Sequence, residues 1–216
     1  MRSYGQYCAV AKALDVLGDR WTLLIVRELL LAGPSRYTDL RAGLPGIATN
    51  LLADRLRELE AAGLVAREEA PPPVATTLFR LTPRGEAIGP VLNELGVWGV
   101  PLMAEGPAPE DQFRARWLAW PAELFLTDTE PDGPPLMVEL RAGDDPVVLE
   151  VSGGEVQVRP GVAADPDAVV TGSPHVMLGV LSGGLELAEA RRRGLTIEGD
   201  AGVLERLRPE LPSAVS

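Results

Sequence analysis

Residue types that enzymes and metal sites depend on are scarce in this chain of 216 residues. It holds one cysteine, Cys8, one histidine, His175, and one lysine, Lys12. A single cysteine excludes an intramolecular disulfide framework, and one histidine with one thiol cannot fill a zinc site. Lys12 follows no glycine-rich turn, which excludes a Walker-type phosphate loop, and no G-x-S-x-G elbow accompanies His175. We therefore expect no metal, no cofactor and no enzymatic activity.

Long apolar runs are also lacking. No stretch approaches the roughly 20 apolar residues that a membrane span needs. The first 21 residues are interrupted by Lys12, Asp15, Asp19 and Arg20, so we expect no signal peptide. These features predict a cytoplasmic protein that does not bind membranes.

Acidic residues are unevenly distributed along the chain. Residues 1–104 carry 11 basic and 11 acidic residues, whereas residues 105–216 carry 9 and 20, which accounts for the whole net charge of -11. A strongly acidic protein binds nucleic acid poorly without sequence specificity. Because the first half is neutral, the acidity of the whole chain does not exclude DNA binding there. This charge distribution does predict that DNA affinity depends only modestly on salt concentration.

Residues 36–67 carry the most specific pattern. Residues 38–43 predict a short helix that Pro45 and Gly46 cannot continue, because proline lacks an amide donor and glycine favours turns. A second helix is expected over residues 49–62, with leucines at the i, i+4, i+7 spacing of one buried stripe: Leu52, Leu56 and Leu59. The layout is that of a helix-turn-helix.

A hairpin is expected directly after this second helix. Gly63 ends the helix, and residues 64–67 and 77–81 predict two strands around three prolines at positions 71–73. Such a hairpin can lie against the phosphate backbone as a wing. The pattern therefore favours double-stranded DNA as the partner.

The candidate DNA-binding residues follow from helix geometry. Asn50, Asp54 and Arg57 project opposite the leucine stripe, and Thr49 and Ala53 lie at the end that enters the major groove in helix-turn-helix proteins. The remaining candidates are polar or basic residues of the first helix, the second helix and the hairpin: Arg36, Thr38, Arg41, Arg55, Arg67 and Arg80. Each of these arginines has the alternative interpretation of an ordinary solvated charge.

Residues 8–104 resemble the HxlR-type winged-helix regulators, a branch of the MarR-like regulators of bacteria. The resemblance rests on CAVAKALDVLGDRWTLLIVRELLLAG, RYTDLRAGLPGIATNLLADRLRELEAAGLVAR and LFRLTPRGEAI, in the family's order. It implies a homodimer, paired through the first helix and a long helix over residues 83–104, on a two-fold DNA site. Where the family pattern often has serine and then a basic residue, this chain has Ala48 and Asn50. We therefore expect the helix cap at Thr49 and pairing of Asn50 with adenine.

The second half of the chain is a different kind of sequence. Proline and acidic residues mark a linker over residues 105–112, which separates a domain of residues 1–104 from one of residues 113–216. Residues 113–126 suggest a helix interrupted at Pro121. Three antiparallel strands are expected over residues 136–142, 146–153 and 155–161, with a Gly153-Gly154 turn. The later elements are expected at residues 168–171 (strand), 175–181 and 187–193 (helices), 195–197 (strand) and 201–207 (helix). The fold class is α+β, a winged helix-turn-helix domain followed by an α+β domain.

Residues 135–208 of this second domain resemble sterol-carrier-protein-type domains. The resemblance rests on GEVQVRPGVAADPDAVVTGS and HVMLGVLSGGLELAEARRRGLTIEGDAGVLERL. It implies an apolar tunnel and therefore an apolar small-molecule effector. The expected lining is apolar residues of the strands and helices: Trp120, Phe125, Met137, Leu149, Val151, Val158, Met177, Leu178 and Leu181. The alternative is a domain without a cavity, in which these residues form an ordinary core.

Cys8 is the remaining candidate site. Several HxlR-type proteins carry a cysteine before the first helix, and a cysteine near a helix N-terminus reacts as a thiolate when its pKa is lowered. A redox-responsive regulator switched through Cys8 is therefore a second hypothesis. The alternative interpretation is that Cys8 is a small buried apolar residue. A carrier of lipid-like ligands, or an enzyme acting on them, without DNA binding, is the third.

Overall fold

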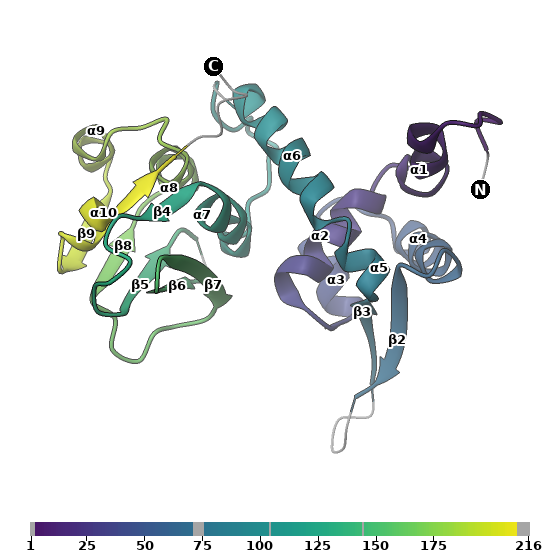
Figure 1. Ribbon diagram of the computed structural model, residues 1–216, viewed down its shortest axis with the longest axis horizontal. Helices are drawn as coiled ribbons and strands as arrows, with labels where there is room; N and C mark the ends of the chain where they lie inside the picture. Colours follow the sequence, from purple (N-terminus) through teal and green to yellow (C-terminus); the bar gives the residue numbers. More distant parts are fainter. Residues whose placement is uncertain (1–2, 71–75, 104, 144, 211–216) are drawn as a thin grey trace. The chain divides into compact units, whose positions relative to one another are not determined.

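The chain folds into two compact units, residues 1–94 and 95–216. The computed structural model describes residues 3–70, 76–103, 105–143 and 145–210 (Figure 1). The division between the units falls inside helix α6 (Gly89–Gly99). Residues 105–112 contain neither helix nor strand, and the domain boundary predicted there stays a prediction.

The first unit is a group of helices with a small sheet. Its elements up to α6 are α1 (Ala9–Leu17), α2 (Thr22–Ala32), β1 (Ser35–Arg36), α3 (Tyr37–Gly43), α4 (Thr49–Ala61), β2 (Val65–Glu69), β3 (Thr77–Leu81) and α5 (Pro83–Glu86). Figure 1 shows the β2–β3 hairpin projecting from these helices. The predicted helix-turn-helix and hairpin are thus confirmed as α3, α4, β2 and β3.

Glycine shapes both ends of α4. Gly46 has φ +88° in the turn before it, where a residue with a Cβ would be strained. After the helix, Gly63 has φ +70°, and the Leu64 N–H donates to the Leu59 carbonyl over 2.9 Å. This is a Schellman-type helix end, with buried leucines at both positions, and it directs the chain into β2.

The hairpin belongs to a three-stranded sheet in the order β1-β3-β2. β2 and β3 pair antiparallel from Val65↔Leu81 to Glu69↔Thr77. The two-residue strand β1 was not predicted, because two residues carry no periodicity. The prolines expected at the hairpin tip lie outside the described residues.

The long helix predicted over residues 83–104 is wrong as a single element. α5 ends at Glu86, α6 begins at Gly89, and the chain continues as a 3₁₀ helix, η1 (Val100–Met103). The physical reason is that Pro90 and Pro101 have no N–H to donate to the carbonyl four residues earlier. Residue 104 lies outside the described residues.

The second unit is built around a five-stranded sheet. Its elements are η2 (Ala115–Leu118), α7 (Ala119–Phe125), β4 (Leu126–Asp128), β5 (Leu136–Arg141), β6 (Val147–Ser152), β7 (Glu155–Pro160), β8 (Ala168–Thr171), α8 (Pro174–Leu181), α9 (Leu187–Arg192), β9 (Thr196–Gly199), α10 (Val203–Arg206) and β10 (Leu207–Pro209). The strand order is β7-β6-β5-β8-β9, with β8 parallel to β5 and every other pair antiparallel. The three predicted antiparallel strands are confirmed, and so is the turn between β6 and β7, where Gly153 and Gly154 both have positive φ.

Two helices of this unit differ from the prediction. The interruption predicted at Pro121 lies earlier, where the 3₁₀ turn η2 passes into α7, because proline fits the first turn of a helix, where no N–H is needed. The helix predicted over residues 201–207 covers only α10. Leu207 instead begins β10, which pairs with the unpredicted strand β4.

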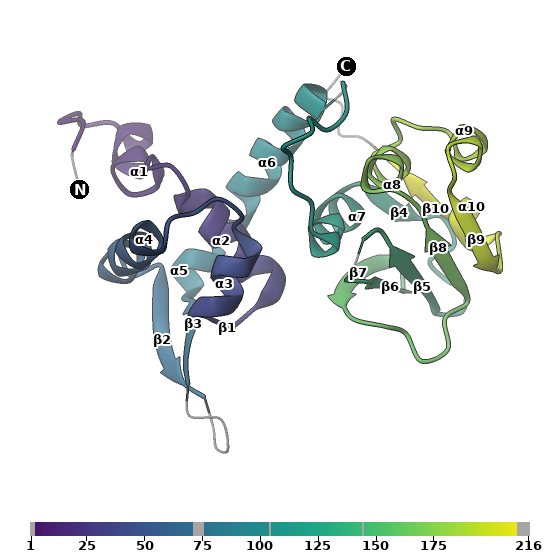
Figure 2. The ribbon, with the colours of Figure 1, turned by 180° about the vertical axis from the view of Figure 1, so that it is seen from behind.

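One face of the sheet carries the core. Apolar residues of β5, β6 and β8 pack with Val176, Met177 and Leu181 of α8, and with residues of η2, α7 and α9, in one cluster. Figures 1 and 2 both show α7 and α8 against one side of this sheet. No helix among the described residues is both long and apolar enough to cross a membrane.

Candidate DNA-binding surface and apolar core

Helix α4 presents two opposite faces. Leu52, Leu56 and Leu59 are at most 2% exposed, whereas Asn50, Asp54 and Arg57 are exposed, as are Thr49 and the preceding Ala48. Ala53 is partly buried. Inward and outward stripes therefore lie where the helical period predicts them. Contact between the outward stripe and DNA stays a prediction.

The start of α4 differs from expectation. Ala48, not Thr49, occupies the N-cap position, and no side chain caps the helix. Thr49 is instead the first helical residue, and its carbonyl accepts a 2.6 Å hydrogen bond from the hydroxyl of Tyr37. Tyr37, which is not among the predicted site residues, thereby ties the start of α3 to the start of α4.

Most candidate arginines are paired with carboxylates. Arg55 contacts Asp19 over 2.7 Å and also Glu58, while Arg57 pairs with Asp54 on the outward stripe. On the hairpin, Arg67 lies 3.0 Å from Glu60 and Arg80 lies 2.9 Å from Glu68. All but one of these side chains are more than a third exposed, the exception being Arg55 at 17%. At these four arginines the positive charge is therefore balanced by a neighbouring carboxylate.

Two candidate arginines differ from the others. Arg36 and Arg41 are exposed and form no ion pair with any residue in the described ranges. Thr38 is exposed too, with its hydroxyl 3.4 Å from Asp39. These three residues come from the segment that opens with β1 and continues through α3.

Cys8 is exposed and occupies the N-cap position of α1. The backbone N–H groups of Ala11 and then Val10 lower the pKa of its thiol. The alternative of a buried apolar residue does not hold for the single chain. Oxidation of Cys8 stays a hypothesis.

Six of the nine predicted lining residues meet in the core of the second unit. Leu149, Val151, Met177 and Leu181 are at most 3% exposed members of the apolar cluster, and Val158 and Leu178 pack against it. Leu149 pairs with Val158 across β6 and β7, so the two share a face of the sheet. All six residues therefore belong to one apolar core or pack against it.

Met137 does not join this group. Its neighbour Val138 pairs with Leu149 and lies in the cluster, so strand alternation directs Met137 to the opposite face. There it is followed by Glu139, a buried carboxylate that accepts hydrogen bonds from the N–H of Ala163 and from Arg141, at 2.8 and 2.7 Å. Burial raises the pKa of Glu139, but these two donors outweigh it and the net shift is downward.

The aromatic candidates lie on α7. Phe125 is 4% exposed. Trp120 is partly buried, and its ring lies so close to Gly96 that a Cβ there would be 3.4 Å from it. Neither is a member of the apolar cluster.

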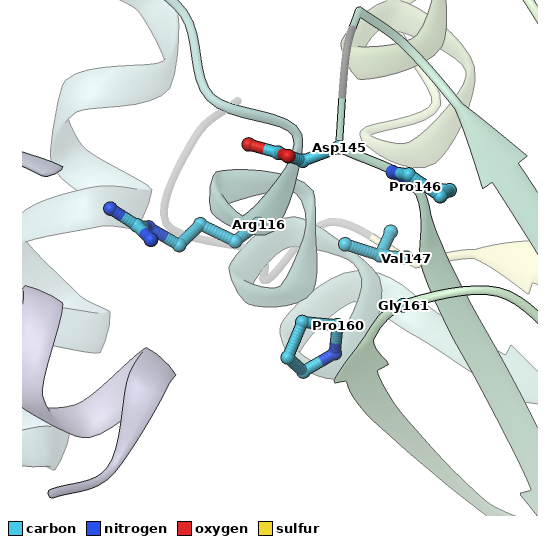
Figure 3. Close-up of a pocket in the computed structure, with 6 residues that line it drawn as sticks. All are labelled: Arg116, Asp145, Pro146, Val147, Pro160 and Gly161. Atoms are coloured by element: carbon cyan, nitrogen blue, oxygen red, sulfur yellow. The ribbon is translucent and has the colours of Figure 1, made fainter. Parts of the chain in front are cut away.

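A hollow of about 260 Å³ in the second unit is lined by different residues. Figure 3 shows Arg116 of η2, Asp145 and Pro146 before β6, Val147 of β6, and Pro160 and Gly161 at the end of β7. None of them belongs to the predicted apolar lining. The tunnel therefore stays a prediction. Among the residues described, no group of three His, Cys, Asp or Glu side chains is placed to hold a metal ion.

Comparison with known proteins assigns each half of the chain separately. The HxlR-like helix-turn-helix family matches residues 16–106, and the SCP-2 sterol transfer family matches residues 132–211. The uncharacterized HTH-type transcriptional regulator YvaP of Bacillus subtilis is 39% identical over 87 residues, 40% of this chain and 80% of YvaP. The HTH-type transcriptional regulator YodB of the same organism is 35% identical over 86 residues, 40% of this chain and 76% of YodB. The solved structure of reduced YodB covers 47% of this chain and 100% of its own, at 31% identity and a TM-score of 0.41.

Proposed function

Because the chain belongs to the HxlR-like helix-turn-helix family, we propose that it regulates transcription as a homodimer that binds a two-fold DNA site. The observation that carries the proposal is α4, whose exposed Asn50, Asp54 and Arg57 stand opposite a buried leucine stripe. A helix so presented enters the major groove, and a hairpin beside it reaches the phosphate backbone. Its relatives YvaP and YodB are named as transcriptional regulators.

Asn50 and Arg57 read bases in this proposal. An asparagine amide pairs bidentately with adenine, and a guanidinium with guanine, each discriminating by about 1–3 kcal/mol against the wrong base. The remaining candidates, including Arg36, Arg41, Arg67 and Arg80, contact phosphates, which fix the position of the protein on the duplex.

Exposed apolar stripes support the homodimer. Val91, Leu95, Trp98 and Leu102 follow one another at helical spacing along α6 and into η1, and are 46–73% exposed. On the N-terminal segment and α1, Tyr7, Val10 and Leu14 form a second stripe of 44% exposure or more. Apolar helix faces of this kind are covered by a partner in stable dimers. Sedimentation equilibrium distinguishes a dimer from the 23.0 kDa monomer.

A gel shift tests sequence-specific DNA binding. It uses the intergenic DNA upstream of the chain's own gene, at about 150 mM salt because the affinity depends on salt. We expect specific binding over scrambled competitor, and a loss of about tenfold or more in Asn50→Ala and Arg57→Ala. Arg84→Ala removes an exposed arginine of the same unit that lies outside the candidate set and serves as the control. Equal binding to scrambled DNA by every protein contradicts base reading.

The second unit is proposed to hold an apolar effector, on the strength of its match to the SCP-2 sterol transfer family. The probes are a long-chain fatty acid and a sterol, each added to the specific DNA complex. Release of DNA at saturating ligand is the expected result. Absence of binding to either probe, with an unchanged gel shift, favours the alternative in which the second unit is a solid core.

The second candidate function is redox response through Cys8, favoured by its exposure and its lowered pKa. The Cys8 thiolate attacks one sulfur of a small disulfide, which forms a mixed disulfide and expels the other half of that molecule as a thiolate. With diamide, the thiolate adds to the N=N bond, and attack by the thiolate of a second Cys8 across the dimer then forms the disulfide and releases diamide reduced to its hydrazine. DNA binding is compared with and without diamide in the wild type and in Cys8→Ser. A response retained by Cys8→Ser overturns this candidate. The third hypothesis is a carrier of lipid-like ligands or an enzyme that acts on them. It requires that the chain binds such a ligand and does not bind DNA.

A further inference from the structure

The first unit contains a second hollow, distinct from the outward stripe of α4. It has a volume of about 370 Å³ and is lined by β1, the start of α3 and the hairpin: Arg36, Tyr37, Thr38, Arg67, Thr76, Thr77 and Phe79. Arg36, Thr38 and Arg67 are among the candidates predicted separately from the sequence, and the other four residues are not. The structure brings all seven to one place.

The charged groups of this lining are all positive. Two residues carry guanidinium groups and four carry hydroxyls, while no lining residue is a carboxylate, in a chain whose net charge is -11. The hollow of the second unit, in contrast, combines Arg116 with Asp145. Guanidinium and hydroxyl donors together match the oxygens of a phosphate or a similar anion. No lining residue supplies a carboxylate for a cation.

Strand pairing organises the hairpin side of the hollow. Arg67 lies directly across from Phe79, with its Cζ 5.4 Å from the ring centroid. Because side chains alternate along a strand, Thr77 lies on the same face as Phe79, whereas Arg80 lies on the opposite face. The ring of Phe79 is 8% exposed and gives the Arg67 guanidinium a fixed support.

Two carboxylates lie next to this set of donors. Glu60 is 3.0 Å from Arg67, and Glu69 accepts a 3.2 Å hydrogen bond from the hydroxyl of Thr77. An incoming anion must compete with both. Arg36 has no such competitor among the described residues. Competition from these two carboxylates weakens the binding of a free anion, whereas an anion that other contacts also hold in place is less affected.

We propose that this hollow is an oxyanion site, which receives one phosphate of the DNA backbone and binds inorganic phosphate when DNA is absent. The DNA half of this inference rests on the proposed function, and the inorganic phosphate half does not. In the DNA complex, Arg67 and Arg36 donate to the phosphate oxygens and the threonine hydroxyls complete the shell. The contact positions the hairpin and carries no sequence information.

Inorganic phosphate titrated into the full chain tests the site directly, with the arginine Nε–H and threonine amide resonances followed by NMR against chloride at matched ionic strength. We expect saturable shifts at Arg67, Thr77 and Thr38. Arg67→Gln and, with less disturbance of the hairpin, Thr77→Val weaken the binding several-fold. Glu60→Gln strengthens it, because the competitor of phosphate for Arg67 is removed. Shifts that never saturate, or that are the same in Arg67→Gln, overturn the inference.

The salt dependence of DNA binding tests the other source of the anion. Each lost phosphate contact reduces the slope of log K against log salt by about 0.9, so Arg67→Gln lowers the slope by about that amount and Arg84→Ala does not change it. A duplex with one neutral methylphosphonate at the contacted position weakens wild-type binding and leaves Arg67→Gln unaffected. Specific binding with an unchanged slope in Arg67→Gln overturns the DNA half of the inference. Saturable phosphate binding by a chain that ignores DNA overturns the proposed function and leaves the oxyanion site standing.

Discussion

Two ion pairs, one in each unit, show two different uses of charge in this chain. In the first unit, Arg57 and Asp54 are 65% and 52% exposed on the outward face of α4. In the second, Arg206 and Asp128 are 7% and 0% exposed. The buried guanidinium donates from Nε and Nη2 to the two carboxylate oxygens at 2.6 and 2.8 Å, and from Nη1 to the Pro134 carbonyl at 2.7 Å.

The same residue types therefore serve two purposes. Exposed pairs contribute little to stability, because water screens the attraction and the side chains lose conformational freedom. Their groups remain accessible to a partner. A buried pair whose donors and acceptors are satisfied joins distant segments, here α10 with the end of β4, and its loss leaves a charge without water. The Arg206–Asp128 pair is structural, whereas the charges of the Arg57–Asp54 pair on α4 are exposed to solvent.

Breaking the buried pair produces the largest expected effect. Arg206→Leu leaves Asp128 buried without its partner, and we expect the second unit to lose about 3–5 kcal/mol of unfolding free energy. Arg193→Leu breaks the 2.8 Å pair with Glu189, where the side chains are 50% and 32% exposed, and is expected to cost at most about 1 kcal/mol. Urea unfolding of both variants measures the difference. Equal losses contradict the distinction between the two kinds of pair.

The pH dependence of the unfolding free energy provides an independent measurement of the same ion pair. Hydrogen bonding from Arg206 lowers the pKa of Asp128. The folded pKa lies below the unfolded value of about 3.9, so this contribution to stability is complete above about pH 4 and is lost as the pH falls through the folded pKa. In Asp128→Asn this part of the pH dependence disappears.

The core of the second unit provides the next largest effect. Leu149 is fully buried in the apolar cluster, and truncation of a leucine in a close-packed core costs about 2–5 kcal/mol because a cavity is left. We expect Leu149→Ala to fall in that range, and Val162→Ala, at 62% exposure in the same unit, to stay within about 0.5 kcal/mol. A loss well below 2 kcal/mol for Leu149→Ala indicates existing open space, and so supports the tunnel.

Local periodicity explains which elements could be predicted. The two faces of α4 follow from leucines at helical spacing, and β5, β6 and β7 from alternating runs with a glycine turn. Strands β1, β4 and β10 have only two or three residues, and they exist because a distant strand pairs with them. Pro90 accounts for the break before α6, which the long helix implied by the family resemblance does not include.

The candidate sites were predictable to a smaller extent, because they depend on contacts between elements. Leu136, Met137 and Val138 are all apolar, so only pairing with β6 decides that Met137 faces away from the core. Likewise, nothing local to Arg67 predicts that Glu60 and Phe79 contact it. Inward-facing residues are visible in a sequence, whereas a hollow or a donor set is a property of the packed structure.

Disruption of the exposed Arg57–Asp54 pair on α4 produces the smallest expected effect. It is also the most direct test of whether these two side chains are accessible to DNA. Asp54→Asn removes a negative charge from the surface proposed to bind DNA and frees the Arg57 guanidinium. We expect tighter DNA binding by less than about 1 kcal/mol, the usual strength of an exposed pair. The gain is larger for scrambled DNA than for the specific site, because it is electrostatic. Glu86→Gln, an exposed acid on α5, controls for net charge. If Arg57→Ala abolishes the gain from Asp54→Asn, the carboxylate acts by restraining that arginine. A gain that persists in the double variant assigns the effect of Asp54 to its own repulsion of the DNA backbone.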